Sequence, residues 1–266
     1  MQGNGSSASD PEPLPKCPLA PGACGEAPPL EKDCEEVKDL LKAPNSSPAM
    51  VYASLNDSKE CCTLRMFPSD WTLLHYASEN LETEPQVVEC LIQGGSDVNA
   101  PTKQGHTPLH IAARWGVVQA INVLIEKGAD VDAKTPLGRH TPLYVAASNG
   151  RSAAVEALAD ANADVNEPDA AGMTPLHQGA TYQATDVVDA LLRRNANVSA
   201  VDSNGKTPLH VAAAGVNLDV ARRLVEEGAN IASTDNRGRS ACACICKSDC
   251  VEREMDIPDM KKLLMC

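Results

Sequence analysis

The sequence predicts an all-α solenoid, in which short helix-turn-helix units stack side by side and hairpin loops join them. A phrase of the type Thr-Pro-Leu-His recurs about every 33 residues. Its copies begin at Thr72, Thr107, Thr141, Thr174 and Thr207, and a degenerate copy begins at Ser240. Aromatic residues make up only 3% of the chain, so the core must consist of Leu, Val, Ile and Ala. Units of this length bury their apolar faces only against their neighbours.

The residues of one unit account for each of its elements in turn. Thr107 suits a helix N-cap, and Pro108 suits the first helical position, where its missing N–H is not needed. An inner helix rich in small apolar residues follows, and Gly116 predicts the turn behind it. An outer helix then carries apolar residues at helical spacing and is expected to end at Gly128.

A second set of positions supports the same alignment of the units. The expected end of each outer helix is Gly or Asn, the residues that best tolerate a left-handed conformation. These residues are Gly95, Gly128, Asn162, Asn195 and Gly228. Two units depart from the pattern at another point, because Gln183 and Val216 replace the turn glycine between the helices. We expect a local irregularity there.

The phrase and its period resemble the ankyrin-repeat family, and the resemblance covers five repeats. Composition and the extent of the repeats predict three segments: residues 1–69 as a Pro-, Gly- and Ser-rich, largely disordered tail, residues 70–235 as the repeat array, and residues 236–266 as a degenerate, Cys-rich capping repeat. In this family the phrase's histidine bridges to the backbone of the next repeat. Tyr144 replaces that histidine in the third repeat, so the bridge is expected to change there.

Two segments outside the array have apolar positions at helical spacing. Residues 31–42 are expected to form a short helix, whose apolar side holds Val37, Leu40 and Leu41. This helix could dock on the end of the array, bind a partner or form only transiently. At the other end Pro258 is expected to begin a last helix, whose apolar side holds Met260, Leu263 and Leu264.

Composition excludes several function classes. No apolar run reaches the length needed to cross a bilayer, and the first 30 residues contain no secretory signal core. Eleven cysteines without paired spacing favour free thiols and a cytoplasmic and/or nuclear location. A net charge of −13 opposes binding to nucleic acid. We therefore expect a monomer that binds protein and needs no cofactor.

The histidines and the known sequence motifs do not indicate catalysis. His75, His110, His177 and His210 occupy one position in successive repeats, so they lie too far apart to share a zinc ion with bonds of about 2 Å. The sequence has no phosphate-binding Gly-rich loop, nucleophile elbow, metalloprotease motif or kinase motif. We expect structural histidines and a protein that is not an enzyme.

A cysteine cluster near the C-terminus allows an alternative function. Cys242, Cys244, Cys246 and Cys250 fall within nine residues, a density that is typical of sites for soft metals. The alternative function is a metal- or redox-responsive regulator. Against it, alignment with the repeats places Cys242, Cys246 and Cys250 on one stripe of an inner helix, where they would be small core residues.

The family resemblance implies a binding surface made of the hairpin tips and the exposed side of the inner helices, which we call the concave face. The face includes Glu79, and the residues that we expect to bind a partner are Trp71, Lys103, Gln104, His106, Arg114, Trp115, Arg139, His140, Ser148, Asn149, Met173, Tyr182, Lys206, Arg237 and Arg239. Six Lys or Arg lie on this face against one acid, Glu79.

The sequence therefore predicts an adaptor or inhibitor that binds an acidic, partly apolar segment of a protein partner. Basic residues on the concave face should attract acidic groups. Trp115, Met173 and Tyr182 are residue types that anchor interfaces. Ordinary solvated surface charge is the alternative interpretation of the basic residues.

Two asparagines are candidate modification sites. Asn99 and Asn166 each follow Asp-Val, with a leucine eight residues before Asn99 and before Asn166. This pattern resembles the hairpin positions where ankyrin proteins are hydroxylated on asparagine. The alternative is that each side chain only hydrogen-bonds its own turn.

Overall fold

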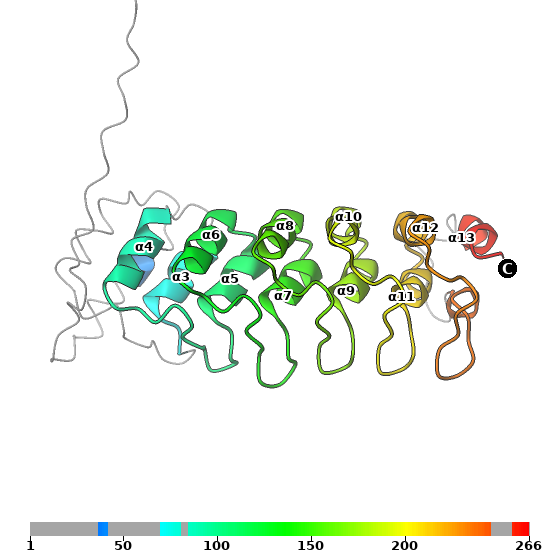
Figure 1. The fold of residues 1–266 in the computed structure, drawn as a ribbon, viewed down its shortest axis with the longest axis horizontal. Helices are drawn as coiled ribbons and strands as arrows, with labels where there is room; N and C mark the ends of the chain where they lie inside the picture. The colour runs from blue at the N-terminus through cyan, green and yellow to red at the C-terminus, as the bar shows by residue number, and fades with distance from the viewer. Residues whose placement is uncertain (1–36, 42–69, 81–84, 246–256, 266) are drawn as a thin grey trace, which may run out of the picture.

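The computed structural model describes residues 37–41, 70–80, 85–245 and 257–265, and it is an elongated stack of helix pairs (Figure 1). The inner row consists of α3 (Leu73–Glu79), α5 (Pro108–Trp115), α7 (Pro142–Ser148), α9 (Pro175–Thr181) and α11 (Pro208–Ala214). The outer row consists of α4 (Pro85–Gln93), α6 (Val118–Glu126), α8 (Ser152–Asp160), α10 (Thr185–Arg193) and α12 (Leu218–Glu226). Hairpins line one edge of the stack (Figure 1). The predicted fold class is confirmed.

The core of the array lies between neighbouring repeats. Each inner helix packs against its own outer helix and against the inner helices of adjacent repeats. The largest fully buried side chains are almost all leucines, as the low aromatic content predicts. One such leucine follows the proline or leucine at the first helical position of every inner helix: Leu74, Leu109, Leu143, Leu176 and Leu209.

The inner helices begin at the predicted threonine caps, and histidine completes the cap in every repeat except the third. In the second repeat the Thr107 N–H donates to His110 Nδ1 at 3.2 Å, and the Thr107 hydroxyl lies 2.9 Å from the same nitrogen. Because a backbone N–H can only donate, Nδ1 is an acceptor. The neutral ring therefore carries its proton on Nε2.

That Nε2–H donates across the repeat boundary to the carbonyl that precedes the next threonine or, in the last case, Ser240. The four bonds are His75 to His106 O at 3.2 Å, His110 to His140 O at 2.9 Å, His177 to Lys206 O at 2.9 Å and His210 to Arg239 O at 3.1 Å. All four rings are buried. Each histidine thus caps one helix and ties two repeats together, as the structural interpretation expected.

Tyr144 replaces this bridge by a different one. Its hydroxyl donates to Asp169 Oδ2 at 2.7 Å and accepts from Gln178 Nε2 at 2.6 Å, so it reaches the next repeat through two side chains. Burial, and then the bond to Asp169, raises the pKa of Tyr144 far above its ordinary value. The phenol therefore stays protonated and keeps donating.

The backbone conformations at the helix ends agree with the sequence at five positions. The left-handed residues after the outer helices have φ of 107°, 89°, 65°, 61° and 89° at Gly95, Gly128, Asn162, Asn195 and Gly228. Gln183 and Val216 keep the left-handed turn as well, with φ of 55° and 53°. The expected local irregularity is therefore wrong for the backbone. The two residues instead hold a conformation that costs non-glycine residues about 1–2 kcal/mol.

Apolar segments cover both ends of the stack. Residues 37–41 are helical, and Val37 and Leu41 are buried in the same core cluster as α3. The Asn80 side-chain amide donates to the Leu41 carbonyl at 2.6 Å. Of the three interpretations of this segment, the structure shows docking; the rest of residues 1–69 lies outside the described residues.

At the C-terminal end α13 (Ile257–Leu263) packs against α12, and its Met260 is buried together with Leu264. The last helix was therefore placed correctly from the sequence.

Acidification from pH 7.5 to pH 5 should destabilise the array, because buried histidines are neutral in the fold. Burial lowers the pKa of His110 from its ordinary value of 6.5 to about 4, and it lowers the pKa of His177. Below pH 6.5 the unfolded chain binds the additional protons, so this stability is present above pH 6.5 and is lost as the pH falls towards 4. The shifted pKa of His110 alone should lower the free energy of unfolding by about 2 kcal/mol at pH 5. Urea unfolding at both pH values tests this, and an unchanged midpoint contradicts it.

The bridge at Tyr144 predicts unequal effects of two substitutions. Tyr144→Phe should cost about 1–3 kcal/mol, because the buried Gln178 amide loses its oxygen acceptor. Tyr144→His should cost less, because an imidazole here can donate to the Met173 carbonyl as the other four histidines do to theirs. Chemical denaturation measures both variants. An unchanged stability of Tyr144→Phe would show that the hydroxyl bonds contribute nothing, and equal losses would show that the imidazole restores no bridge.

Relief of the left-handed strain should be measurable at Gln183. Its side chain is exposed, so Gln183→Gly removes little packing and should stabilise the array by about 1 kcal/mol. The control is Gln119→Gly in α6, also exposed, which should destabilise by up to about 1 kcal/mol because its backbone is helical. The two midpoints in urea should move in opposite directions; movement in the same direction contradicts the argument.

Candidate protein-binding surface

Each hairpin is closed by one side chain near its start, and the type of that side chain changes along the array. Before α5 and α7 it is a threonine: Thr102 Oγ1 accepts from the His106 N–H at 3.1 Å, and Thr135 Oγ1 accepts from the His140 N–H at 3.0 Å. Before α9 the Asp169 carboxylate accepts two backbone N–H bonds, both at 2.8 Å.

The two hairpins that follow are also closed by aspartates. Asp202 and Asp235 each accept two backbone N–H bonds in the same way. The hairpins of the second and third repeats therefore lack a negative charge that all the later hairpins carry. This difference makes the concave face more positive over the second and third repeats.

Two of the predicted basic residues are engaged inside the array. Arg239 bonds Asp235 through Nε and Nη2 at 2.9 and 2.7 Å, and this guanidinium holds the pKa of Asp235 well below its usual range. Arg139 pairs with Glu167 at 3.1 Å, and Lys134 pairs with the same carboxylate at 2.7 Å. These ion pairs partly neutralise Arg139 and Arg239, so less of their positive charge is available to the carboxylates of an acidic partner.

The other predicted basic residues remain available. Within the described ranges, no carboxylate lies at ion-pair distance from Lys103, Arg114, Lys206 or Arg237. Lys103, Arg114 and Arg237 are exposed, and Lys206 is partly exposed.

The structure adds Arg151, which the sequence analysis missed, to the side of the second repeat. Its Nε donates to the Arg114 carbonyl at 3.2 Å, and its side chain is exposed.

His106 lies close enough to Arg114 to feel its charge. Burial, followed by the charges of Arg114 and His140, lowers the pKa of His106. Lys103, His106, Arg114 and Arg151 form what we call the basic cluster. Arg151 directly follows the turn residue Gly150, and this position in the sequence could have marked it as a residue near the preceding repeat.

The predicted aromatic residues fall into two groups. Trp115 and Tyr182 are 39% and 61% exposed, so their rings are accessible to a partner. Trp71 instead packs on Tyr76 with ring centroids 5.0 Å apart, and His140 stacks on Tyr144 at 4.6 Å. Trp71 and His140 are therefore partly used within the fold.

The remaining predicted residues of the concave face contribute polar groups. The Ser148 hydroxyl and the Asn149 amide both donate to the Val145 carbonyl, at 3.0 and 2.8 Å, and so complete the end of α7. Met173 is partly buried, and its sulfur accepts from Gln178 at 3.8 Å. Gln104 is exposed at the tip of its hairpin.

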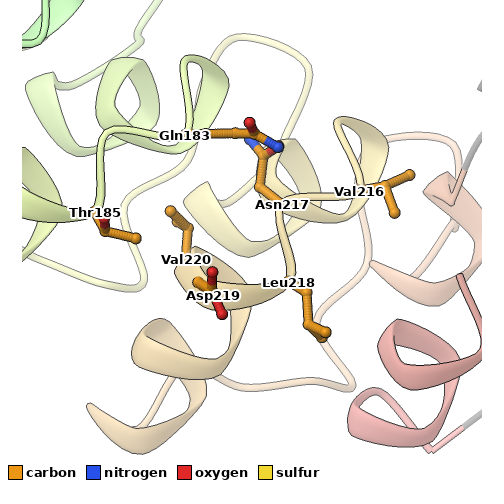
Figure 2. A pocket seen from close by; sticks show the side chains of 7 residues that line it. All are labelled: Gln183, Thr185, Val216, Asn217, Leu218, Asp219 and Val220. Carbon is orange, nitrogen blue, oxygen red and sulfur yellow. The ribbon is translucent and has the colours of Figure 1, made fainter. Parts of the chain in front are cut away.

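A cavity of about 300 Å³ lies where the fourth and fifth repeats meet (Figure 2). Its lining residues are Gln183, Thr185, Val216, Asn217, Leu218, Asp219 and Val220. It includes both residues with the strained left-handed turn. Asn217 is buried there and donates to the Ala180 carbonyl at 2.5 Å, so this wall is held by the preceding repeat.

The repeats match a known family over most of the chain. Residues 30–135, 135–202 and 186–253 match a model described as ankyrin repeats in three copies. The chain belongs to the ankyrin-repeat family. The matched region begins well before residue 70 and includes the docked segment 37–41, which the sequence analysis had assigned to the tail.

Several known proteins are similar to parts of this array. Protein phosphatase 1 regulatory subunit 12A of Mus musculus is 38% identical over 76 residues, which is 29% of this chain and 7% of that protein. Rabankyrin-5 of Homo sapiens is 39% identical over 80 residues, covering 26% and 7%. Alpha-latrotoxin-Lh1a of Latrodectus hasselti is 27% identical over 121 residues, covering 43% and 9%. The chain thus spans only a small part of each relative.

Asn99 and Asn166 both join adjacent ankyrin repeats. The Asn99 side-chain oxygen accepts from the Asp130 N–H, and that of Asn166 accepts from the Asn197 N–H, each at 2.8 Å. The side chains therefore bond the next repeat rather than only their own turns. Hydroxylation at these two positions stays a prediction.

The cysteine cluster differs from what the ankyrin alignment predicted. The sixth inner helix is reduced to the 3-10 turn η2 (Cys242–Cys244), and Ile245 leaves helical conformation, so the expected helical stripe is wrong at its start. Cys246 and Cys250 lie outside the described residues. Cys90 in α4 and Cys242 in η2 each belong to a disulfide, but not to the same one, whereas Cys244 is free. The expectation of free thiols is therefore wrong for Cys90 and Cys242.

The residues that the structure describes contain no group of three or more His, Cys, Asp or Glu arranged to hold a metal ion. They also contain no helix with the length and hydropathy of a membrane span.

Proposed function

We propose that this ankyrin array is a non-catalytic adaptor or inhibitor that binds an acidic, partly apolar segment of a protein partner. Ankyrin repeats are protein-interaction modules, and one relative is a regulatory subunit of a phosphatase by name. The observation that carries the proposal is the basic cluster beside Trp115, in a chain whose net charge is −13.

The charge distribution supports one location for the proposed binding region. A chain this acidic repels an acidic partner over most of its surface, so a local positive area determines where the partner approaches. The basic cluster combines unpaired Lys103 and Arg114 with neutral closing residues in the neighbouring hairpins. We therefore place the acidic residues of the partner at the second and third repeats.

Exposed rings supply the apolar part of the site. Trp115 ends α5 directly beside Arg114, and Tyr182 follows α9 at the equivalent end of an inner helix. Partly exposed aromatic rings next to unpaired charges are typical of residues that dominate binding energy. The partner segment should therefore run along the inner-helix ends and combine acidic with apolar side chains.

Selection from a random peptide library displayed on phage tests the proposal with the full chain as bait. Enriched peptides should contain several Asp or Glu together with Leu, Phe or Trp. For the tightest peptide, Lys103→Glu with Arg114→Glu should slow association about tenfold at low salt, because attraction becomes repulsion. Trp115→Ala should raise the dissociation rate and cost about 2 kcal/mol.

A matched control separates a local effect from a change of net charge. Arg222→Glu with Lys261→Glu changes the net charge equally, at exposed residues of α12 and α13, and should alter binding less than twofold. Enrichment of basic peptides, or loss of binding only in this control, would place the site elsewhere. Arg139 is left unchanged because its reversal would also break the ion pair with Glu167.

A further inference from the structure

The cavity between the fourth and fifth repeats lies at the turns that join inner to outer helices, at the opposite end of the helices from the hairpins (Figure 2). Gln183 and Val216 occupy these turns in left-handed conformations, where the second and third repeats have Gly116 and Gly150. Positive φ at a β-branched residue is a genuine outlier, and backbone strain of this kind concentrates at ligand sites. The strained turns therefore point to the cavity that they line.

The equivalent place between the second and third repeats is filled by a guanidinium of the chain itself. Arg151 follows the turn residue of its repeat, and its stem lies against Gly116, where an added Cβ would be 3.1 Å from the arginine Cδ. Its Nε donates to the Arg114 carbonyl near the end of α5, at 3.2 Å. The end of one inner helix is thus bonded by an arginine from the next repeat.

Between the fourth and fifth repeats a shorter side chain takes the position of that arginine. Asn217 stands where Arg151 stands in its repeat, and its amide donates to the Ala180 and Thr181 carbonyls at 2.5 and 3.4 Å. Thr181 corresponds in turn to Arg114. The same kind of helix end is therefore reached by a side chain shorter than arginine, and a cavity of about 300 Å³ remains beside it.

The lining of the cavity offers acceptors to a group that only donates hydrogen bonds. Val216 and Val220 are each 1% exposed, so they contribute little of the accessible lining. Gln183 supplies an amide oxygen, Thr185 a hydroxyl and Asp219 a carboxylate. A guanidinium has five N–H donors and no acceptor, so it matches these groups.

The negative charge at the cavity is not balanced by the chain. Within the ranges that the structure describes, no Lys or Arg lies at ion-pair distance from Asp219, and Arg222, three residues further along α12, does not reach it. Arg223 already bonds three other carboxylates. Asp186 adds a second exposed acid at the equivalent position of α10. The cavity should therefore attract a cation.

We propose that this cavity binds a guanidinium group of a ligand, with Asp219 as its counter-ion. The group takes the place that Arg151 fills between the second and third repeats. Planar guanidinium pairs with carboxylate through two parallel N–H bonds, which favours it over a compact ammonium. A free guanidine compound and an arginine side chain of a protein share this chemistry. The site differs from the basic cluster in place and in the sign of its charge, so it does not rest on the proposed function.

NMR titration of the isotope-labelled full chain tests the proposal with two probes. Butylguanidine represents a free small molecule, and Nα-acetyl-arginine N-methylamide represents an arginine side chain of a protein. At least one of them should shift the backbone amide signals of Val216, Asn217 and Leu218, and the tighter probe identifies the source. Nα-acetyl-citrulline N-methylamide has the shape of the second probe without its charge, and it should bind about tenfold more weakly than the arginine probe or not at all.

Two variants then identify the groups that hold the guanidinium. Asp219→Asn should weaken binding of the tighter probe about tenfold, because the charge-assisted bonds are lost. The matched control is Glu126→Gln, which removes an exposed carboxylate from α6 and should change the affinity less than about twofold. Asn217→Arg should fill the cavity from within, as Arg151 does between the second and third repeats, and should abolish binding.

Several outcomes would overturn the proposal: no shift with either probe, shifts confined to residues away from the cavity, equal binding of the arginine and citrulline probes, or unchanged affinity of Asp219→Asn. If circular dichroism shows that Asn217→Arg does not fold, Asp219→Asn and the citrulline probe still decide. The peptide selection on the basic cluster uses a ligand of opposite charge at another place, so the two proposals can fail independently.

Discussion

The histidine bridge is the interaction on which the rest of the array depends. One neutral imidazole accepts the N–H that precedes its own helix and donates to a carbonyl of the following repeat. Both bonds are made only if the ring is buried, unprotonated and in the Nε2–H form. The bridges tolerate small changes of repeat length, because donor and acceptor are 31, 30, 29 and 29 residues apart in the four bridges and the distance stays between 2.9 and 3.2 Å. Where Tyr144 interrupts the series, the longer phenol reaches a side chain of the next hairpin instead.

The electrostatic character of the concave face follows from how its hairpins are closed. A threonine hydroxyl and an aspartate carboxylate both accept backbone N–H groups at this position, so either residue satisfies the turn. Only the aspartate adds a charge. The basic cluster is thus produced as much by Thr102 and Thr135 as by its own lysine and arginines. A residue that serves the fold in every repeat also sets the local charge of the surface.

Features that depend on one repeat could be predicted from the sequence, whereas features that depend on two repeats mostly could not. The threonine caps and the left-handed Asn162 follow from local preferences, and the structure has them. The pairing of Arg139 with Glu167 joins residues from adjacent hairpins, so their distance is set by the stacking. The same holds for Arg151, whose contact with the Arg114 carbonyl crosses a repeat boundary. Local pattern also overstated the disorder near residues 37–41, because their burial requires α3 as a partner.

The histidine bridges all run in one direction, and this gives the stack two chemically different ends. Every donor lies in the earlier repeat and every acceptor in the later one, up to the Arg239 carbonyl of the degenerate repeat. That last repeat accepts a bridge but has Ala243 where four repeats carry histidine and the third carries Tyr144, so the series of donors stops there. A middle repeat could be duplicated with all its bridges intact, since its two interfaces are complementary. The end units are not interchangeable, because the first repeat donates a histidine N–H to its neighbour and the last repeat only accepts one. Repeats with complete bridges can therefore be added only between these two units.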